Sequence, residues 1–185
     1  MSNLSKFRPN KENQGVDIKM VRCDTYSSSF ESLYNTYTTY CEEHPNGSWF
    51  PEFQRGLVWT QEQKEQLILS MLNGLPIGAF YLNDWWFDED EKRAKMDHVL
   101  FDGQQRFTAI LEFLTGQFPI TFEGKEYYVT DLSFQEWLNI KRYPISIVHS
   151  YIENWNALID YYVLINKGGT QHTNEEFQKA LDCKE

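Results

Sequence analysis

The residues best suited to chemistry lie in the segment FDGQQRFTAI, residues 101–110. An acid, a glycine, two amides and an arginine come directly before apolar residues at helical spacing, which predicts a helix over residues 104–115. The first backbone amides of a helix have no partner within it, and the helix dipole adds positive charge at that end. A phosphate or another anion would therefore fit the start of this helix.

Each polar residue of this segment has a use at an anion site. Gly103 would let a phosphate approach the backbone without a Cβ in the way, and Gln104 and Gln105 could donate amide hydrogens. Arg106 could donate two parallel hydrogen bonds to phosphate oxygens, and Asp102 could hold a divalent metal or fix the turn. The same residues could instead form a plain Asp-Gly turn with a helix-capping acid and Arg106 in a surface ion pair, and on the Asp-Gly turn alone this interpretation is favoured.

Two other polar clusters favour a shared site over an isolated turn. The segment PEFQRGLVW, residues 51–59, places Gln54 and Arg55 after an aromatic residue and before a glycine, and INKGGTQHT covers residues 165–173. Charged groups beside apolar segments are seldom buried without a reason. We therefore expect one cleft to be lined by Arg55, Asp102, Gln105 and Arg106.

Capping patterns and periodicity predict the elements that must position these clusters. Ser28 and Glu31 form a capping-box pattern before a helix over about 29–42, and Thr60 and Gln63 repeat it before a helix over 60–74. Between these helices, the segment 48–56 is predicted to be extended. The remaining elements are expected as strands at 77–82, 98–101 and 144–150, a hairpin at 118–129, and helices at 131–140, 153–166 and after Thr173.

These elements indicate an α+β fold, in which a small mixed sheet is flanked by the helices at 60–74 and 104–115. A chain of 185 residues with 41% hydrophobic content is long enough for one domain with a core and too short for two. We expect a flexible segment over residues 1–20 and a single domain over residues 21–185.

Composition narrows the function classes. The formal charge of −10 argues against direct DNA binding through clustered basic residues, although it is compatible with a local basic pocket. Three cysteines without CxxC spacing favour a reducing compartment over a disulfide scaffold. The polar N-terminus lacks a signal segment, and no apolar run approaches the ~18 residues that span a bilayer. We therefore expect a cytoplasmic protein without membrane contact.

Four motifs, taken together, resemble those of a known family. They are PEFQRGLVW, SMLNGLPIGAFYL at 70–82, FDGQQRFTAI and INKGGTQHT. Their order and spacing over residues 25–180 resemble the GmrSD-type N-terminal domain of type IV restriction systems and related phage-defence proteins. The resemblance implies a ParB/sulfiredoxin-like α+β fold with the 102–106 segment at a nucleoside triphosphate (NTP). In that family the domain binds NTPs, hydrolyses them in several members, and thereby controls a nuclease.

The resemblance also implies roles for individual residues. Asp102, Gln105 and Arg106 would be catalytic, and Asp102 would also hold Mg²⁺. The residues that would bind the nucleotide are Gln54, Arg55, Gly103, Gln104, Asn166 and Gly169. The nuclease of such systems occupies a long separate domain with a His-Asn-His centre, for which a chain ending at Glu185 has no room, so we expect a stand-alone form.

Two function classes remain. The first is a nucleotide-binding regulatory module, with or without NTP hydrolysis, that acts through a protein partner such as a nuclease or a defence protein. The alternative is a non-catalytic, phage-borne adaptor or decoy that binds a host defence protein and so has an anti-defence role. Exposed aromatic residues such as Trp85 and Trp86 would favour the adaptor, but the two rings could equally pack inward.

Overall fold

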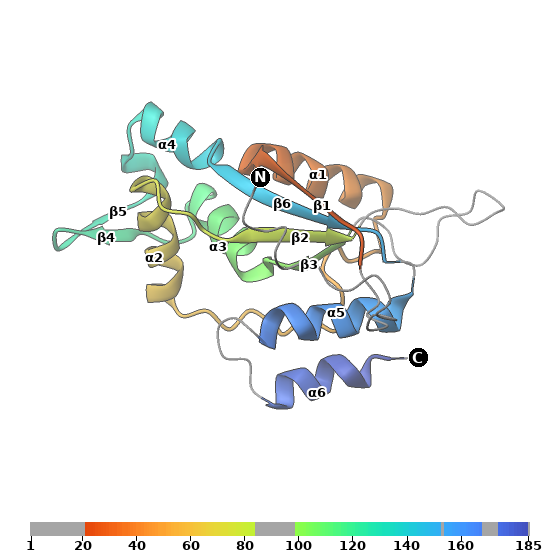
Figure 1. The fold of residues 1–185 in the computed structure, drawn as a ribbon. Helices are drawn as coiled ribbons and strands as arrows, with labels where there is room; N and C mark the ends of the chain where they lie inside the picture. The colour runs from red at the N-terminus through yellow and green to blue at the C-terminus, as the bar shows by residue number, and fades with distance from the viewer. Residues whose placement is uncertain (1–20, 84–98, 153, 168–173, 185) are drawn as a thin grey trace, which may run out of the picture.

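Most segments with helical or strand-like spacing form the expected element in the computed structural model, which describes residues 21–83, 99–152, 154–167 and 174–184 (Figure 1). The strands are β1 (Cys23–Ser29), β2 (Ala79–Asn83), β3 (Val99–Asp102), β4 (Ile120–Phe122), β5 (Lys125–Tyr127) and β6 (Pro144–Ser150). The helices are α1 (Phe30–Glu43), α2 (Gln61–Leu72), α3 (Gln104–Leu114), the 3-10 turn η2 (Val129–Asp131), α4 (Phe134–Lys141), α5 (Trp155–Lys167) and α6 (Asn174–Asp182).

Four strands form one mixed sheet in the order β1-β6-β2-β3. β1 is antiparallel to β6, with Tyr26 opposite Ile147, and β6 is parallel to β2, with Ile147 opposite Phe80. β2 and β3 are antiparallel, and their register shifts between Tyr81 and Leu82. β4 and β5 form a separate two-stranded hairpin. The fold is therefore α+β with a small mixed sheet, which confirms the prediction.

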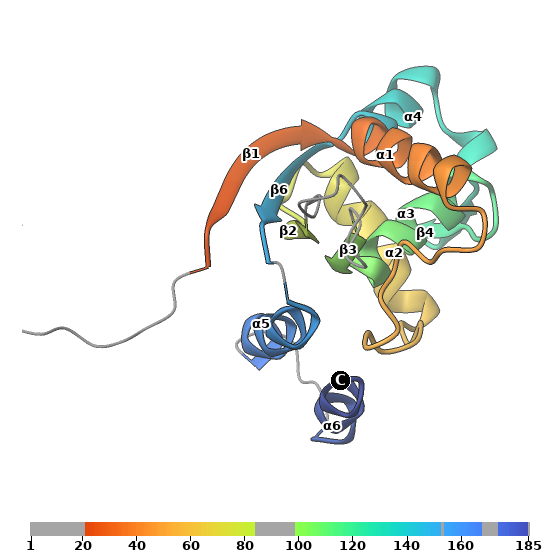
Figure 2. The same ribbon diagram turned by 90° about the vertical axis from the view of Figure 1, so that its right-hand side faces the viewer.

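Helices lie on both faces of the sheet. Figure 2 shows α1 and α3 on one side of the strands, with α5 and α6 apart from them. Neighbouring residues of β2 face opposite sides, as in any strand, because Phe80 lies against Arg106 of α3 whereas Tyr81 lies against Phe101. α5 packs on the second face through Tyr161, whose ring centroid is 5.9 Å from that of Phe101.

A cluster of aromatic rings fixes the position of α3. The buried ring of Phe107 lies 5.4 Å from Phe30, 5.2 Å from Tyr37 and 5.1 Å from Trp49, measured between ring centroids. Such tilted and edge-on ring pairs add to the free energy gained from burial. Because Phe107 directly follows the polar residues 102–106, this packing also fixes the direction in which those residues point.

Of the two predicted caps within the described residues, one is confirmed and one is wrong by one residue. Thr60 and Gln63 form the expected capping box, in which the Thr60 side chain accepts from the Gln63 amide, and α2 begins one residue later. At α1, however, the predicted cap is wrong by one residue, since Ser29 caps the helix by accepting from the Ser32 amide at 3.2 Å. Ser28 lies one residue before the cap position, within β1.

Two other predictions need correction. The segment 48–56 is not extended throughout, because it contains a turn at 51–54 in which the Gln54 amide donates to the Pro51 carbonyl at 3.1 Å. β1 was not predicted at all. Its sequence CDTYSSS is mostly polar and mostly exposed, so it lacks the apolar alternation that marks a strand.

Some predictions fall outside the described residues, namely those on residues 1–20, on Trp85 and Trp86, on Gly169 and on Thr173. Within the described part of the chain, no helix has the length and apolar character that crossing a membrane requires.

Candidate functional site

A cleft of about 290 Å³ opens where β3 passes into α3. The turn before α2, the strand β2 and the helix α5 supply its other walls. Its lining residues are Gln54, Arg55, Trp59, Tyr81, Asp102, Gly103, Gln104, Gln105, Arg106, Tyr162, Ile165 and Asn166. The structure thus brings Arg55, Asp102, Gln105 and Arg106 to one cleft, as expected. What each of these residues does there stays a prediction.

The turn from β3 into α3 requires a glycine. Gly103 has φ 109° and ψ 3°, in the left-handed region that residues with a Cβ rarely adopt. A Cβ at this position would also lie 2.6 Å from Cδ1 of Phe80. The sequence suggested that Gly103 leaves room for a ligand, whereas the packing shows that the room at its Cβ position is taken by the Phe80 ring.

α3 begins without a side-chain cap. Gly103 occupies the cap position and cannot accept a hydrogen bond through a side chain, and the first turn of the helix holds no acid. By contrast, Ser29, Thr60 and Ser133 cap α1, α2 and α4 through their hydroxyls. The first amides of α3 are therefore open to an external acceptor at a cleft, where the helix dipole favours an anion.

Asp102 and Arg106 form an ion pair inside the cleft wall. Nη2 of Arg106 donates to Oδ2 of Asp102 at 2.8 Å, and the two side chains are 17% and 24% exposed. Nη1 donates to the Ile77 carbonyl at 3.0 Å, and the guanidinium lies over the Phe80 ring, 4.9 Å from its centroid. The plain-turn interpretation thus predicted the ion pair correctly, although the pair is partly buried and not on the open surface.

Burial lowers the pKa of the Arg106 guanidinium from its ordinary value, and the charge of Asp102 opposes this fall. The chain just before β2 approaches this group closely, since a Cβ at Gly78, where φ is 82°, would lie 2.6 Å from Nη1 of Arg106. Arg106 is therefore held from three sides, by Asp102, by the backbone at 77–78 and by Phe80.

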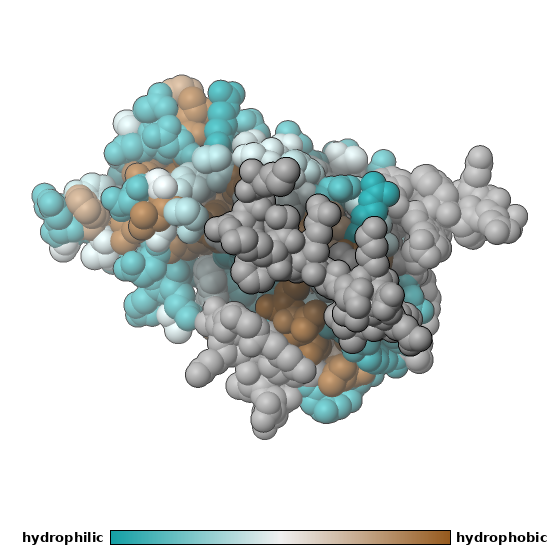
Figure 3. Space-filling view, in the orientation of Figure 1, coloured by the Kyte–Doolittle hydropathy of each residue, from teal (hydrophilic) through white to brown (hydrophobic). Residues whose placement is uncertain are grey.

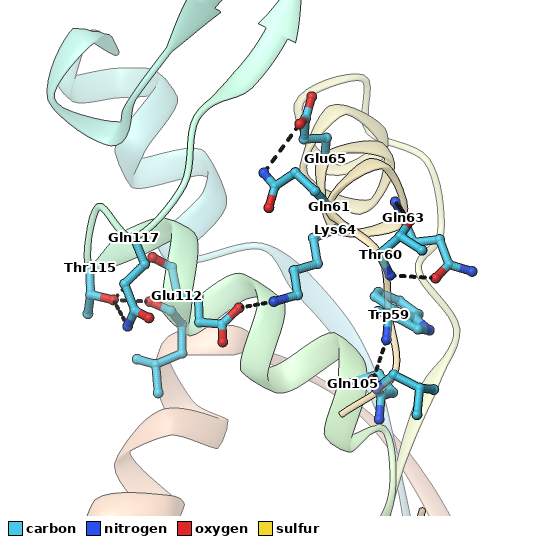
Figure 4. Close-up of polar contacts among 12 residues, drawn as sticks. Trp59, Thr60, Gln61, Gln63, Lys64, Glu65, Gln105, Glu112, Thr115 and Gln117 are labelled. Atoms are coloured by element: carbon cyan, nitrogen blue, oxygen red, sulfur yellow. Dashed lines mark hydrogen bonds and ion pairs between the residues drawn. The ribbon is translucent and has the colours of Figure 1, made fainter. Parts of the chain in front are cut away.

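Gln105 contacts the chain before α2. Its Oε1 accepts from the amides of Val58 at 3.0 Å and Trp59 at 3.2 Å, and its Nε2 donates to the Gly56 carbonyl at 2.8 Å. Figure 4 shows the side chain beside Trp59, next to the start of α2. These contacts join the start of α3 to residues 56–59.

The remaining predicted site residues hold different positions. Gln54 is buried and donates from Nε2 to the Leu100 carbonyl, which ties the turn to β3. Asn166 donates to the Tyr162 carbonyl at 2.9 Å within α5 and lines the cleft. Gln104 also lines the cleft, and its side-chain amide makes no hydrogen bond with the described residues.

Sequence reasoning missed four apolar or aromatic cleft residues, which are Trp59, Tyr81, Tyr162 and Ile165. Trp59 ends the motif PEFQRGLVW and could have been included on that ground. Tyr81 lies in a predicted strand, but which way its side chain faces depends on the register with β3. Tyr162 and Ile165 belong to a helical stripe that is equally typical of a buried core.

The charges at the cleft differ from those of the whole protein. Its lining holds two arginines, Arg55 and Arg106, and one carboxylate, Asp102, whereas the full chain carries a formal charge of −10. An anionic ligand would therefore find the cleft locally favourable.

The structure is an α+β domain with a polar cleft, and the sequence assigns it to a family. The profile described as GmrSD restriction endonuclease, N-terminal domain, matches residues 30–183. The chain belongs to this family and is thus a restriction-related module of the phage-defence type. Comparison with curated proteins gave no match, and neither did comparison with solved structures.

Proposed function

We propose that the cleft binds a nucleoside triphosphate and that the domain is a nucleotide-dependent regulator of a nuclease or another defence protein. The observation that carries this proposal is that the uncapped start of α3 and the side chain of Arg55 line the same cleft. Helix amides and an arginine are the groups that bind phosphates most effectively in proteins. Membership of the restriction family supports a role of this domain in defence.

The cleft also has apolar lining that suits a base or sugar. Trp59, Tyr81, Tyr162 and Ile165 provide aromatic and aliphatic surface there. Ligand sites commonly combine such apolar walls with a few placed polar groups. The side chains of Gln104 and Asn166 can supply hydrogen bonds to base or ribose edges.

The cleft also suits a magnesium ion that arrives with the nucleotide. Asp102 uses Oδ2 for Arg106, and among the described residues Oδ1 has no hydrogen-bond partner. No group of three or more potential ligands that could hold a metal ion is present in the described part of the chain. Mg²⁺ is typically held by one or two carboxylates plus phosphates and waters, so Asp102 would suffice, and the ion would supply charge neutralisation at the phosphates.

A calorimetric titration with each of the four ribonucleoside triphosphates and Mg²⁺ tests the proposal. Arg55→Ala should weaken the binding of the preferred NTP about tenfold or more, as expected for loss of a charge-assisted hydrogen bond. Arg142→Ala is the matched control, because it removes the same charge from an exposed arginine that pairs with Glu31 on α1, away from the cleft. Lack of binding by the wild-type protein at millimolar NTP would exclude the proposal.

The role of the metal is tested separately. Asp102→Asn should reduce Mg²⁺-dependent binding and any phosphate release while leaving the uncharged packing of the turn intact. If the substitution lowers only the melting temperature, Asp102 serves the ion pair with Arg106 and not a metal.

The adaptor is the second candidate function, and one feature of the surface favours it. Phe134 is 73% exposed, and Phe122 and Tyr128 are exposed as well. These residues belong to β4, α4 and the chain between them, at the end of the molecule away from α6 (Figure 1), where Figure 3 shows apolar surface among hydrophilic residues. An adaptor would need such apolar surface to contact a host protein but would not need the cleft, so variants of Phe134 and of Arg55 should separate the two functions.

A further inference from the structure

The side chain of Gln105 suggests a role that differs from the catalytic one implied by its motif. All three of its hydrogen bonds with the described residues are to backbone atoms of residues 56–59, which lie 46–49 positions earlier in the chain. Together they use the acceptor oxygen twice and the donor nitrogen once. An amide occupied in this way is poorly placed to act on a ligand as well.

Among the described residues, the middle of the segment 55–59 has few other supports, whereas Trp59 at its end packs against the core. It lies between the turn at Pro51–Gln54 and the start of α2, and it contains no helix or strand. Leu57 and Val58 are 52% and 53% exposed, so burial does little to hold them. Segments with exposed backbone and little packing open at low free energy. The contacts from Gln105 are therefore important for the position of this segment.

The same segment supplies two walls of the cleft. Arg55 and Trp59, its first and last residues, both line the cleft, while Gly56, Leu57 and Val58 between them do not. A shift of the segment would thus move a cationic group and an aromatic ring at once. The exposed pair Leu57 and Val58 would move with them.

We propose that Gln105 is a positioning residue that clamps segment 55–59 over the cleft, so that nucleotide binding and the position of the exposed Leu57–Val58 pair are coupled. The inference rests on the proposed nucleotide site and adds a means of regulation to it. A nucleotide that contacts Arg55 and Trp59 stabilises the clamped form of the segment. By linkage, a molecule that binds Leu57 and Val58 only in that form strengthens nucleotide binding. The factor equals the one by which the nucleotide strengthens the binding of that molecule.

The test is amide hydrogen exchange, resolved by residue, on the full chain with and without the preferred NTP. Gln105→Leu keeps much of the side-chain volume and removes all three hydrogen bonds. Exchange at Val58 and Trp59 should then rise about tenfold, since both amides lose their acceptor. The variant should bind NTP at least about fivefold more weakly. In the wild type NTP should slow exchange at these two amides, and in the variant it should do so much less.

Two other variants make the result specific. Gln105→Glu keeps an acceptor for the Val58 and Trp59 amides but loses the bond to the Gly56 carbonyl, so these amides should exchange more slowly than in Gln105→Leu. This variant also serves if Gln105→Leu does not fold. Gln135→Leu is the matched control, because it removes an exposed glutamine amide that bonds Asn139 on α4. It should change neither exchange at 58–59 nor NTP affinity.

The outcomes separate the inference from the proposed function. If the wild type binds no NTP, the proposed function fails and the coupling fails with it. If the wild type binds NTP and Gln105→Leu binds it equally well, the coupling alone is overturned. Unchanged exchange at Val58 and Trp59 in Gln105→Leu overturns the clamp itself. A loss of phosphate release in Gln105→Leu with unchanged NTP affinity and unchanged exchange would instead restore the catalytic role.

Discussion

Replacing Gly103 by alanine should be one of the most damaging small changes in this protein. The new methyl group would lie 2.6 Å from Cδ1 of Phe80, well inside normal contact, and φ is 109°. A residue with a Cβ held in a sparsely populated backbone region costs on the order of 1–3 kcal/mol. Forcing an extra carbon into a packed core costs a further ~1–3 kcal/mol. The expected loss of stability is therefore about 2–6 kcal/mol.

Gly74→Ala is the matched control for this prediction. Gly74 also has a positive φ, 72°, but a Cβ there would have no neighbour within 4 Å among the described residues. Only the backbone term applies, which is about 1–2 kcal/mol for a left-handed position. Most of the difference between the two variants should therefore come from the contact with Phe80.

Urea unfolding of both variants measures the effect, with the melting temperature as a second probe. For a chain of this size, 1 kcal/mol corresponds to roughly 2–4 °C in Tm. Combining Gly103→Ala with Phe80→Leu should recover part of the loss, because the smaller side chain leaves room for the methyl group. If Gly103→Ala is no more destabilising than Gly74→Ala, the reasoning from the Phe80 contact is wrong.

Three further predictions concern other groups. Arg106→Lys should lower Tm and weaken NTP binding about tenfold, because an ammonium cannot bond Asp102 and the Ile77 carbonyl in the same planar geometry; unchanged values in both assays would contradict this. Thr60→Ala should cost ~1 kcal/mol in unfolding free energy through loss of the cap on α2, without a comparable loss in NTP affinity. Lys141 and Arg142 lower the pKa of Glu31 from its ordinary value. Its contribution to the free energy of unfolding is therefore present above the ordinary pKa and is lost as pH falls through the lowered pKa. In unfolding measured against pH, Glu31→Gln should flatten this part of the stability curve.

The sequence predicted those features that depend on local interactions. The capping box at Thr60, the turn into α3 and the strand over 144–150 each follow from residues close together in the chain. The sequence also predicted that Arg55, Asp102, Gln105 and Arg106 share a cleft, but not the long-range contacts that hold it together. Gln105 contacts residues 46–49 positions away, and nothing in its neighbours indicates those partners. β1 was missed for a related reason, since pairing with β6 and not its own apolar pattern makes it a strand.

Gly103 is a second case in which the sequence alone gave an incomplete explanation. A glycine before a polar helix start predicts space for a ligand, and the cleft does open beside it. The space that a Cβ would fill, however, belongs to Phe80 on β2. A side chain at position 103 is thus excluded by packing against Phe80. The sequence could not show this, because Phe80 is distant in the chain.

Consecutive residues at the start of α3 make contacts with different parts of the protein. In a helix each residue is rotated by about 100° from the one before, so neighbours point in different directions. Phe107 enters the aromatic core, Arg106 pairs with Asp102 in the cleft wall, and Gln105 bonds the segment before α2. Gln104 lines the cleft without a hydrogen bond to any described residue. A substitution at 105 or 106 therefore changes the shape of the cleft, whether or not the residue also takes part in chemistry there. Loss of activity in such a variant identifies a catalytic group only when the stability and the exchange of segment 55–59 are shown to be unchanged.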